Sequence, residues 1–130
     1  MPCRVDFTHM TNVIAVRLAA LMGFLAVALG ASGAHWLNGI VSAHNTAATW
    51  ETAVLYHFVH AIMLYVLGQR RPVPSGPWLS FFAGIVIFSG SLYLLAVTNA
   101  KWLGAITPLG GVSFLVGWLW LAVGAGKANA

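Results

Sequence analysis

The chain has 130 residues, of which 60% are hydrophobic and only 6% are charged, and its mean hydropathy is +0.87. Soluble domains carry about 25% charged residues, so this composition cannot cover a water-facing surface and places the chain in lipid. The formal net charge of +4 comes from basic residues that lie almost entirely at or between the ends of apolar segments. That distribution indicates membrane orientation rather than nucleic-acid binding.

Four apolar segments are each long enough to cross a membrane. They cover residues 13–36, 47–68, 78–97 and 103–125. A helix of about 20 residues, rising 1.5 Å per residue, spans the ~30 Å of bilayer hydrocarbon. Because these segments use most of the chain, no room remains for a soluble catalytic domain. We therefore predict one all-α integral membrane domain over residues 1–130, folded as a bundle of four transmembrane helices.

The connections between these segments are short. The first segment ends in GASGAHWLNG, and we expect a spanning helix rather than a cleaved signal peptide, because its small residues continue into a helix-like stretch. A loop over residues 38–46 follows. The second connection, QRRPVPSGP, contains three prolines and one glycine, which stop helix propagation. The third connection, NAKW, predicts a tight turn.

Basic residues predict the orientation of the bundle, because short loops rich in Lys and Arg stay on the cytoplasmic side. With four spans, the N-terminus, the second connection and the C-terminus share one side. That side holds five of the six basic residues, which are Arg4, Arg17, Arg70, Arg71 and Lys127. The other side holds only Lys101. We therefore predict that both termini lie in the cytoplasm.

Small residues suggest how the helices associate, since close backbone packing holds helices together in lipid. We expect the glycines of the spans to form packing surfaces: Gly30, Gly33, Gly84, Gly90, Gly104, Gly110, Gly111 and Gly117.

A weak similarity links ASGAHWL (31–37) with FSGSLYL (88–94), which we place at equivalent outward ends of the first and third spans. It suggests two helical hairpins in tandem. Five tryptophans lie near span ends, and we expect most of them to be interfacial anchors: Trp36, Trp50, Trp78, Trp102 and Trp120.

Polar residues near the outward ends allow two interpretations. Glu51 lies about one turn inside the second span, and His35 and Thr107 approach a similar level. In the first interpretation, His35, Glu51 and hydroxyl groups form a proton or ligand site. In the second, which we favour, Glu51 accepts backbone or indole N–H groups near a helix N-terminus, where the helix dipole stabilises negative charge. Thr107, which precedes a proline, is expected to be the N-cap of the fourth helix.

Two histidines lie deeper in the second span. His57 and His60 are about 9 Å and 13 Å below Glu51 at 1.5 Å per residue. At ~100° per residue they share a face from which Glu51 points away, so these residues form no triad on one helix face. We expect interhelical hydrogen bonds here, in which the i,i+4 pairs Tyr56/His60 and Ser89/Tyr93 meet across the bundle.

Four segments carry a resemblance to a known family: GASGAH (30–35), TAVLYHFVHAI (52–62), FSGSLYLLAVT (88–98) and TPLGGVSFLVGW (107–118). With their order and spacing, the chain resembles the YgdD-like small membrane proteins, domain-of-unknown-function family 423. It departs from the family pattern at Ser32, where a larger residue, often Phe, is usual. The resemblance implies a small bacterial inner-membrane protein, related to a small eukaryotic transmembrane protein. It supplies no established activity, substrate, cofactor or catalytic residue.

The sequence thus predicts a non-enzymatic multi-pass membrane protein without a cofactor, acting through helix–helix contacts as a homo-oligomer or an accessory subunit. Two alternatives stay open. The first is a small transporter or channel with a polar path through His57, His60, Ser89 and Tyr93. The second is a haem or metal binder that uses the same histidines, although a further ligand from another helix is then needed.

Overall fold

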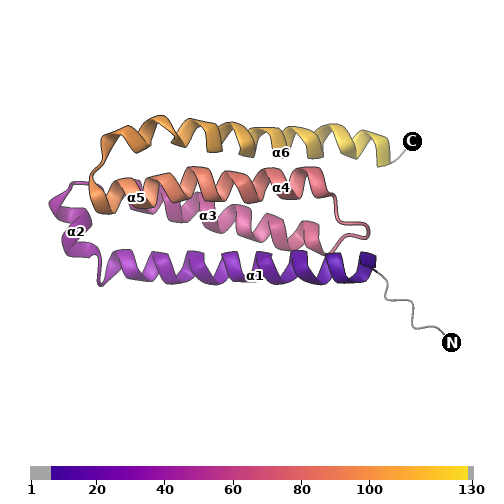
Figure 1. The fold of residues 1–130 in the computed structure, drawn as a ribbon, viewed down its shortest axis with the longest axis horizontal. Helices are drawn as coiled ribbons and strands as arrows, with labels where there is room; N and C mark the ends of the chain where they lie inside the picture. The colour runs from indigo at the N-terminus through magenta and orange to yellow at the C-terminus, as the bar shows by residue number, and fades with distance from the viewer. Residues whose placement is uncertain (1–6, 129–130) are drawn as a thin grey trace.

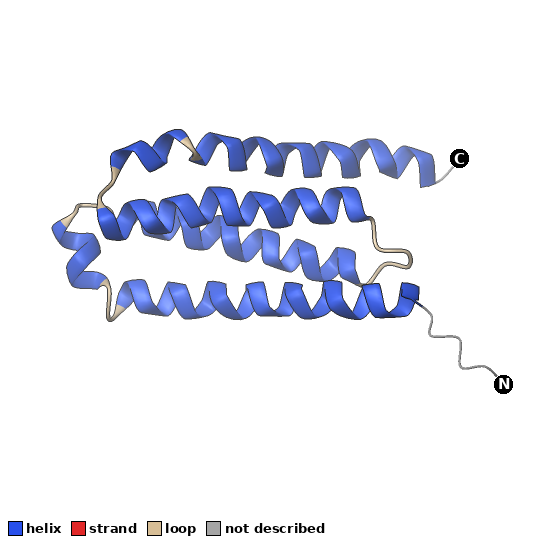
Figure 2. Cartoon of the chain, in the orientation of Figure 1, coloured by secondary structure: helices blue, strands red, loops and turns tan. Residues whose placement is uncertain are grey.

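The computed structural model describes the backbone of residues 7–128 and the side chains of residues 12–125. Its described backbone consists of helices and short connections (Figures 1 and 2). In chain order the elements are α1 (Phe7–Ala34), α2 (Asn38–Ala43), α3 (Ala47–Gly68), α4 (Ser75–Gly84), the π-helical η1 (Ile85–Ser89), α5 (Gly90–Thr98), the 3₁₀-helical η2 (Lys101–Ala105) and α6 (Thr107–Ala128).

Four helical segments are long and apolar enough to cross a membrane, which agrees with the predicted fold class of four transmembrane helices. They run over Asn12–Ala34, Ala47–Gly68, Ser75–Thr98 and Lys101–Ala125. The third span joins α4, η1 and α5 into one continuous helix, because the polypeptide keeps helical dihedrals through both junctions. It begins three residues earlier than predicted, since Ser75 to Pro77 already form its first turn.

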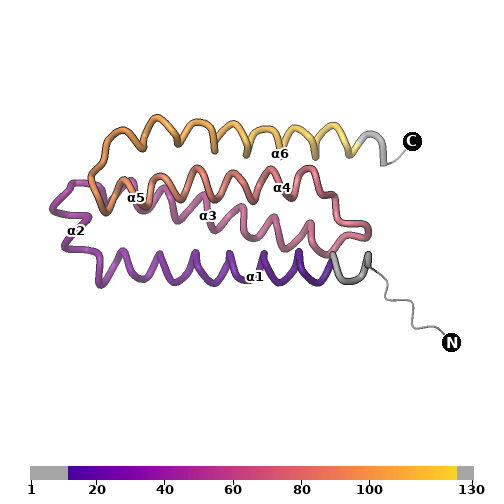
Figure 3. The backbone as a smooth tube through the Cα atoms, viewed as in Figure 1, coloured from indigo at the N-terminus to yellow at the C-terminus, as the bar shows by residue number. Residues whose placement is uncertain are grey.

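The helices run alternately up and down along the long axis of the molecule. Both ends of the described backbone lie at one end, called here the terminal end, while α2 and the turn between α5 and α6 lie at the other, called here the far end (Figures 1 and 3). Helix α1 packs mainly on α3, and α6 packs mainly on α4 and η1. Helix α3 also contacts α4, η1 and α5, so it joins the two hairpins.

The two sequence segments thought to be equivalent occupy different places in these hairpins. Residues 31–37 cross the end of α1, which stops at Ala34, whereas residues 88–94 lie inside the continuous third span, which runs on to Thr98. Their assignment to equivalent outward ends is therefore wrong. The loop expected over residues 38–46 also differs, because it contains α2. Val41 of α2 is buried against Trp50 and Ala96, and this contact orders the short helix.

The tryptophans divide into two groups. Trp36 and Trp102 are 87% and 68% exposed at the far end, as interfacial anchors should be. Trp50 and Trp78 are buried instead, and their indole N–H groups donate to the carbonyls of Leu29 and Leu64. For these two the anchoring prediction is wrong. Each indole has an apolar body that fills the interior and a polar tip that finds a backbone acceptor.

Two clusters form the interior. The larger one joins all four spans through Ala15, Ala19, Leu64, Leu67, Trp78, Phe81, Ile85 and Phe114. The smaller one, at the far end, contains Val41, Trp50 and Ala96. Alanines on α1 face the larger residues of α3 and α4, and small side chains of this kind permit close backbone approach in lipid.

At several points a glycine lets two helices pack closely against each other, as predicted. A Cβ atom at Gly110 would collide with the backbone of Phe88, and one at Gly33 would collide with the Trp50 ring. Glycines 84 and 117 make similar contacts with the rings of Phe114 and Phe81. Gly90 faces open space, so the packing role expected for it is wrong.

Replacing Gly110 should therefore destabilise the bundle. In Gly110→Ala the new methyl group meets the Phe88 backbone, which cannot rotate away, and overpacking of this kind costs ~1–3 kcal/mol. The matched control is Gly23→Ala on α1, where the added methyl group has nothing within 4 Å. Unfolding by SDS titration in detergent should show a loss for Gly110→Ala and a change within ~0.5 kcal/mol for Gly23→Ala. Equal stabilities would contradict this packing.

Candidate functional site

The first candidate site is the polar centre of the bundle, where His57 of α3 meets Tyr93 of α5. Nδ1 of His57 is 2.9 Å from the Tyr93 hydroxyl oxygen. His57 is only 3% exposed, and its Nε2 atom has no hydrogen-bond partner among the described residues. His57 thus lies between the two hairpins.

His60, one turn further along α3, uses both ring nitrogens. Its Nδ1–H group donates to the carbonyl of Tyr56 at 2.7 Å, and its Nε2 atom accepts the indole N–H of Trp118 at 3.1 Å. One neutral tautomer satisfies both bonds. The ring also stacks on Phe114, with 3.7 Å between ring centroids. His60 thereby links α3 to α6, two helices that otherwise make few backbone contacts.

The other predicted polar residues of the centre bind backbone or aromatic groups. The Ser89 hydroxyl is fully buried and donates to the carbonyl of Ala53 at 2.8 Å. Tyr56 packs its ring against Phe88, with centroids 4.6 Å apart. The structure therefore joins His57 to Tyr93, but it gives Ser89 a backbone partner rather than one of the Tyr56/His60 pair. Trp118 was missed by sequence reasoning, although its i,i+4 spacing from Phe114 is the signal that could have found it.

The outward polar residues do not form the cluster of the first interpretation. His35 follows the end of α1 and is exposed, and Glu51 is exposed on α3. Among the described residues neither forms an ion pair or a side-chain hydrogen bond. In the second interpretation Glu51 accepts an indole N–H group. The indole N–H of the neighbouring Trp50 donates instead to the Leu29 carbonyl at 2.9 Å. Glu51 is thus a carboxylate without a partner in the described part of the chain.

Thr107 does not cap α6 as predicted. It is the first residue of that helix, and its hydroxyl lies 2.7 Å from the Ser91 hydroxyl and 3.3 Å from the Leu103 carbonyl oxygen. The preceding residues already form the 3₁₀ turn η2, so the chain enters α6 from a helical turn rather than from an extended residue. Thr107 therefore connects α6 to α5 at the far end.

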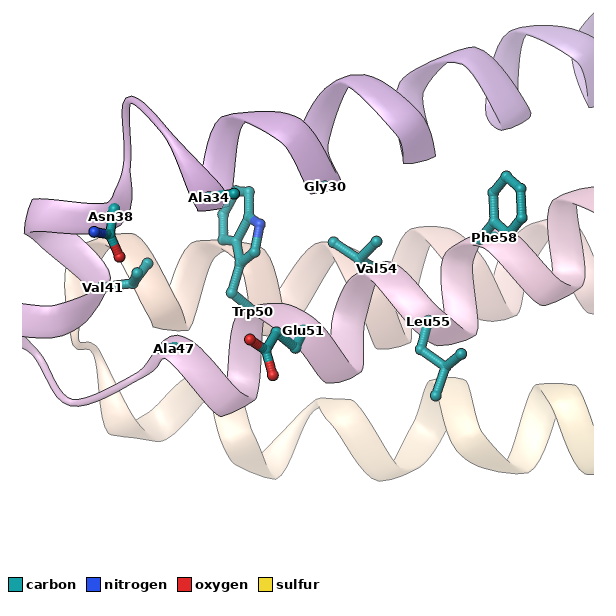
Figure 4. Close-up of a pocket in the computed structure, with 11 residues that line it drawn as sticks. Gly30, Ala34, Asn38, Val41, Ala47, Trp50, Glu51, Val54, Leu55 and Phe58 are labelled. Atoms are coloured by element: carbon teal, nitrogen blue, oxygen red, sulfur yellow. The ribbon is translucent and has the colours of Figure 1, made fainter.

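Glu51 borders a groove between α1 and α3 at the far end, called here the Glu51 groove (Figure 4). Its volume is about 400 Å³. In Figure 4 the Trp50 ring reaches toward α1, while Glu51 lies at the surface of α3. The groove is lined by Gly30, Gly33, Ala34, Asn38, Val41, Ala47, Trp50, Glu51, Val54, Leu55 and Phe58. It is the place where small residues of α1 and the one carboxylate of the described residues come together.

Residues 29–111 match the family model described as "Protein of unknown function (DUF423)". The chain belongs to this family. It is 47% identical over 117 residues to the UPF0382 membrane protein YwdK of Bacillus subtilis, which covers 85% of this chain and 94% of the relative. It is 44% identical over 111 residues to the UPF0382 membrane protein SAB0533 of Staphylococcus aureus, covering 82% of this chain and 89% of the relative. No solved structure matches the chain.

The DUF423 assignment confirms the resemblance that the four sequence segments carried. The relatives are named as membrane proteins, and the structure has four helices that can cross a membrane, so the fold class is confirmed as well. The protein is an integral membrane protein of a family of unknown function. Within residues 12–125, no group of three or more His, Cys, Asp or Glu side chains is placed to hold a metal ion.

A double-mutant cycle should detect the bond between His60 and Trp118. His60→Phe keeps a ring that stacks on Phe114 but removes the acceptor, and Trp118→Phe removes the donor. Interhelical hydrogen bonds of membrane proteins couple by ~0.6 kcal/mol on average and up to ~1.7 kcal/mol. We expect a coupling energy in this range from SDS unfolding. The control cycle pairs His60→Phe with Trp120→Phe on the same helix, where coupling should be absent, and equal couplings would contradict the bond.

Proposed function

We propose that this protein is a non-enzymatic membrane protein that acts through helix–helix contacts, as a homo-oligomer or as an accessory subunit of another membrane protein. The observation that carries the proposal is Glu51, an exposed carboxylate on a spanning helix beside the Glu51 groove. A charged group within the membrane costs ~2.5–3.5 kcal/mol at the helix centre, and less near the interface. A partner that brings a cation to Glu51 removes this cost.

The lining of the Glu51 groove suits a partner helix or turn. Ala34 on α1 and Ala47 on α3 are exposed and present almost no side-chain bulk, whereas Gly30 and Gly33 already pack against Val54 and Trp50 of α3. Small residues let a neighbouring backbone approach closely, which is the main source of helix association in lipid. A carboxylate beside such a surface makes the helix contact specific, because only a partner with a matching donor pairs with the carboxylate.

A second copy of the chain supplies the matching group. Lys101 lies at the same far end, in η2 between α5 and α6, and it is exposed. Within the described residues it forms no ion pair with Glu51. In a twofold dimer each copy offers the same surface, so one interface holds two Glu51–Lys101 pairs. Trp102 beside it is 68% exposed and offers an aromatic ring to the same contact.

The polar centre supports a structural role rather than a transport path. His60 has both ring nitrogens in hydrogen bonds, Ser89 donates to a backbone carbonyl, and Tyr93 contacts His57. These groups connect α3 to its neighbours, and hydrogen bonds between helices are a common use of polar residues in membranes.

Exchanging the two charges tests the dimer. Glu51→Lys and Lys101→Glu should each lower the dimer fraction in native mass spectrometry, and the double exchange should restore it. Exposed ion pairs contribute ~0.2–1 kcal/mol each, so two pairs change the dimer dissociation constant by about two- to thirtyfold. The control, His35→Gln, alters an exposed residue of the same end that does not line the groove.

Two outcomes separate the forms of the proposal. A monomer that copurifies with another membrane protein in a Glu51-dependent manner supports the accessory-subunit form. A monomer whose copurifying proteins are unaffected by Glu51→Lys contradicts both forms.

We further propose that the terminal end faces the cytoplasm of a bacterial inner membrane. Arg17, Arg70 and Arg71 lie at this end, and Lys101 lies at the far end, as the orientation rule for basic residues requires.

The single cysteine, Cys3, gives a direct test of orientation. A membrane-impermeant maleimide should label Cys3 only after cells are opened. In a Cys3→Ser background, Asn99→Cys in the exposed far-end turn should be labelled in intact cells. Labelling of Cys3 in intact cells would reverse the orientation.

A further inference from the structure

We propose that the terminal end carries a binding site for the phosphate of an anionic phospholipid, built around Arg17 of α1 and Arg71 after α3. Both line one groove between these two helices, called here the arginine groove, with a volume of about 390 Å³. Its lining consists of Asn12, Val13, Val16, Arg17, Tyr65, Gly68, Gln69 and Arg71. This site is separate from the Glu51 groove, which lies at the far end.

The charges of the arginine groove call for an anion. Two arginines line one groove, so their positive charges make it attractive to an anion. Among the side chains of residues 12–125 the only carboxylate, Glu51, is at the far end, so no described acid neutralises the arginines. A phosphate group in the groove supplies the missing negative charge, and the planar fork of Arg matches phosphate oxygens in pairs.

The remaining polar side chains of the groove are of a kind that binds a headgroup. Tyr65 offers a hydroxyl group, and Asn12 and Gln69 offer amides, all able to donate to phosphate or ester oxygens. Asn12 is only 9% exposed, so its amide belongs to the wall of the groove rather than to a freely moving surface side chain. These three uncharged donors lie beside the two arginines, although the orientation rule needs only the basic charges.

The position of the groove selects a lipid over a free phosphate ion. It lies where the apolar spans of α1 and α3 reach the terminal end, the depth at which lipid headgroups lie. Val13 and Val16, which belong to the spanning part of α1, give the groove an apolar wall beside Arg17, against which the first part of an acyl chain packs. Gly68 allows α3 to approach Val16 closely, since a Cβ at Gly68 would lie 3.1 Å from a Val16 methyl carbon.

The neighbouring residue Arg70 provides an internal comparison. It lines a different groove, which also contains Pro77 and Trp120. The orientation rule requires basic residues at this end but is indifferent to which groove they enter. Arg70 and Arg71 therefore contribute equally to orientation, whereas only Arg71 belongs to the proposed site.

The experiment measures lipid retention on the detergent-purified full chain by native mass spectrometry. Phosphatidylglycerol should remain bound more strongly than phosphatidylcholine. Arg17→Gln and Arg71→Gln should each reduce phosphatidylglycerol retention about fivefold or more, whereas Arg70→Gln, with the same change in charge, should leave it near the parent level. Arg17→Lys with Arg71→Lys keeps the charge and the orientation but loses the planar fork, so this variant should fold and still bind more weakly.

Three results would overturn the site. Equal losses in Arg70→Gln and Arg71→Gln would show a general effect of charge. Full retention in the double Lys variant would show that the guanidinium geometry plays no part. Displacement of phosphatidylglycerol by millimolar inorganic phosphate would show a site for the free ion rather than for a lipid. None of these measurements depends on the oligomeric state, so the proposed function is tested separately.

Discussion

Close contact between helix backbones is the constraint on which the bundle depends. In lipid the hydrophobic effect does not drive one apolar helix onto another, so packing and interhelical hydrogen bonds must hold the helices together. Gly110 shows the limit of this packing, because its position leaves no space for even a methyl group against the Phe88 backbone. Without such contacts the spans would remain four separate helices in the bilayer.

The π-helical turn η1 lies where these contacts converge. The Ser89 hydroxyl in this turn donates to the Ala53 carbonyl of α3. The Phe88 backbone packs closely against Gly110 of α6, and Ile85 belongs to the larger interior cluster. A π-helical turn adds a residue to the local helical repeat and so re-aims the side chains that follow it. Here the turn places the Ser89 hydroxyl toward α3 and the Phe88 backbone toward α6, so this one irregular turn joins both hairpins.

Sequence patterns predicted the four-helix fold class well because the bilayer imposes one strong requirement on the length and polarity of a spanning helix. They predicted side-chain partners poorly, because partners depend on how helices rotate about their axes. Trp118 shows this difference. Its i,i+4 spacing from Phe114 places it on the same face of α6 as that residue, but only the packing of α6 brings its indole N–H to His60. Trp50 and Trp78 were misassigned for a related reason, since closeness to a span end does not say whether a ring faces lipid or the interior.

The polar residues of the bundle separate by depth into two uses. In the centre, where an unpaired polar group is most costly, His60, Ser89 and Tyr93 have partners within the chain. The exception among the described residues is the buried Nε2 atom of His57, whose ring is bonded through Nδ1 alone. At the ends, where water and headgroups lower this cost, Glu51 and Arg71 border grooves without an oppositely charged partner among the described residues. Groups already engaged in holding the fold have little capacity left for a ligand. A molecule that binds this protein therefore meets its unengaged charges at the two ends, where the far end offers a carboxylate and the terminal end offers guanidinium groups.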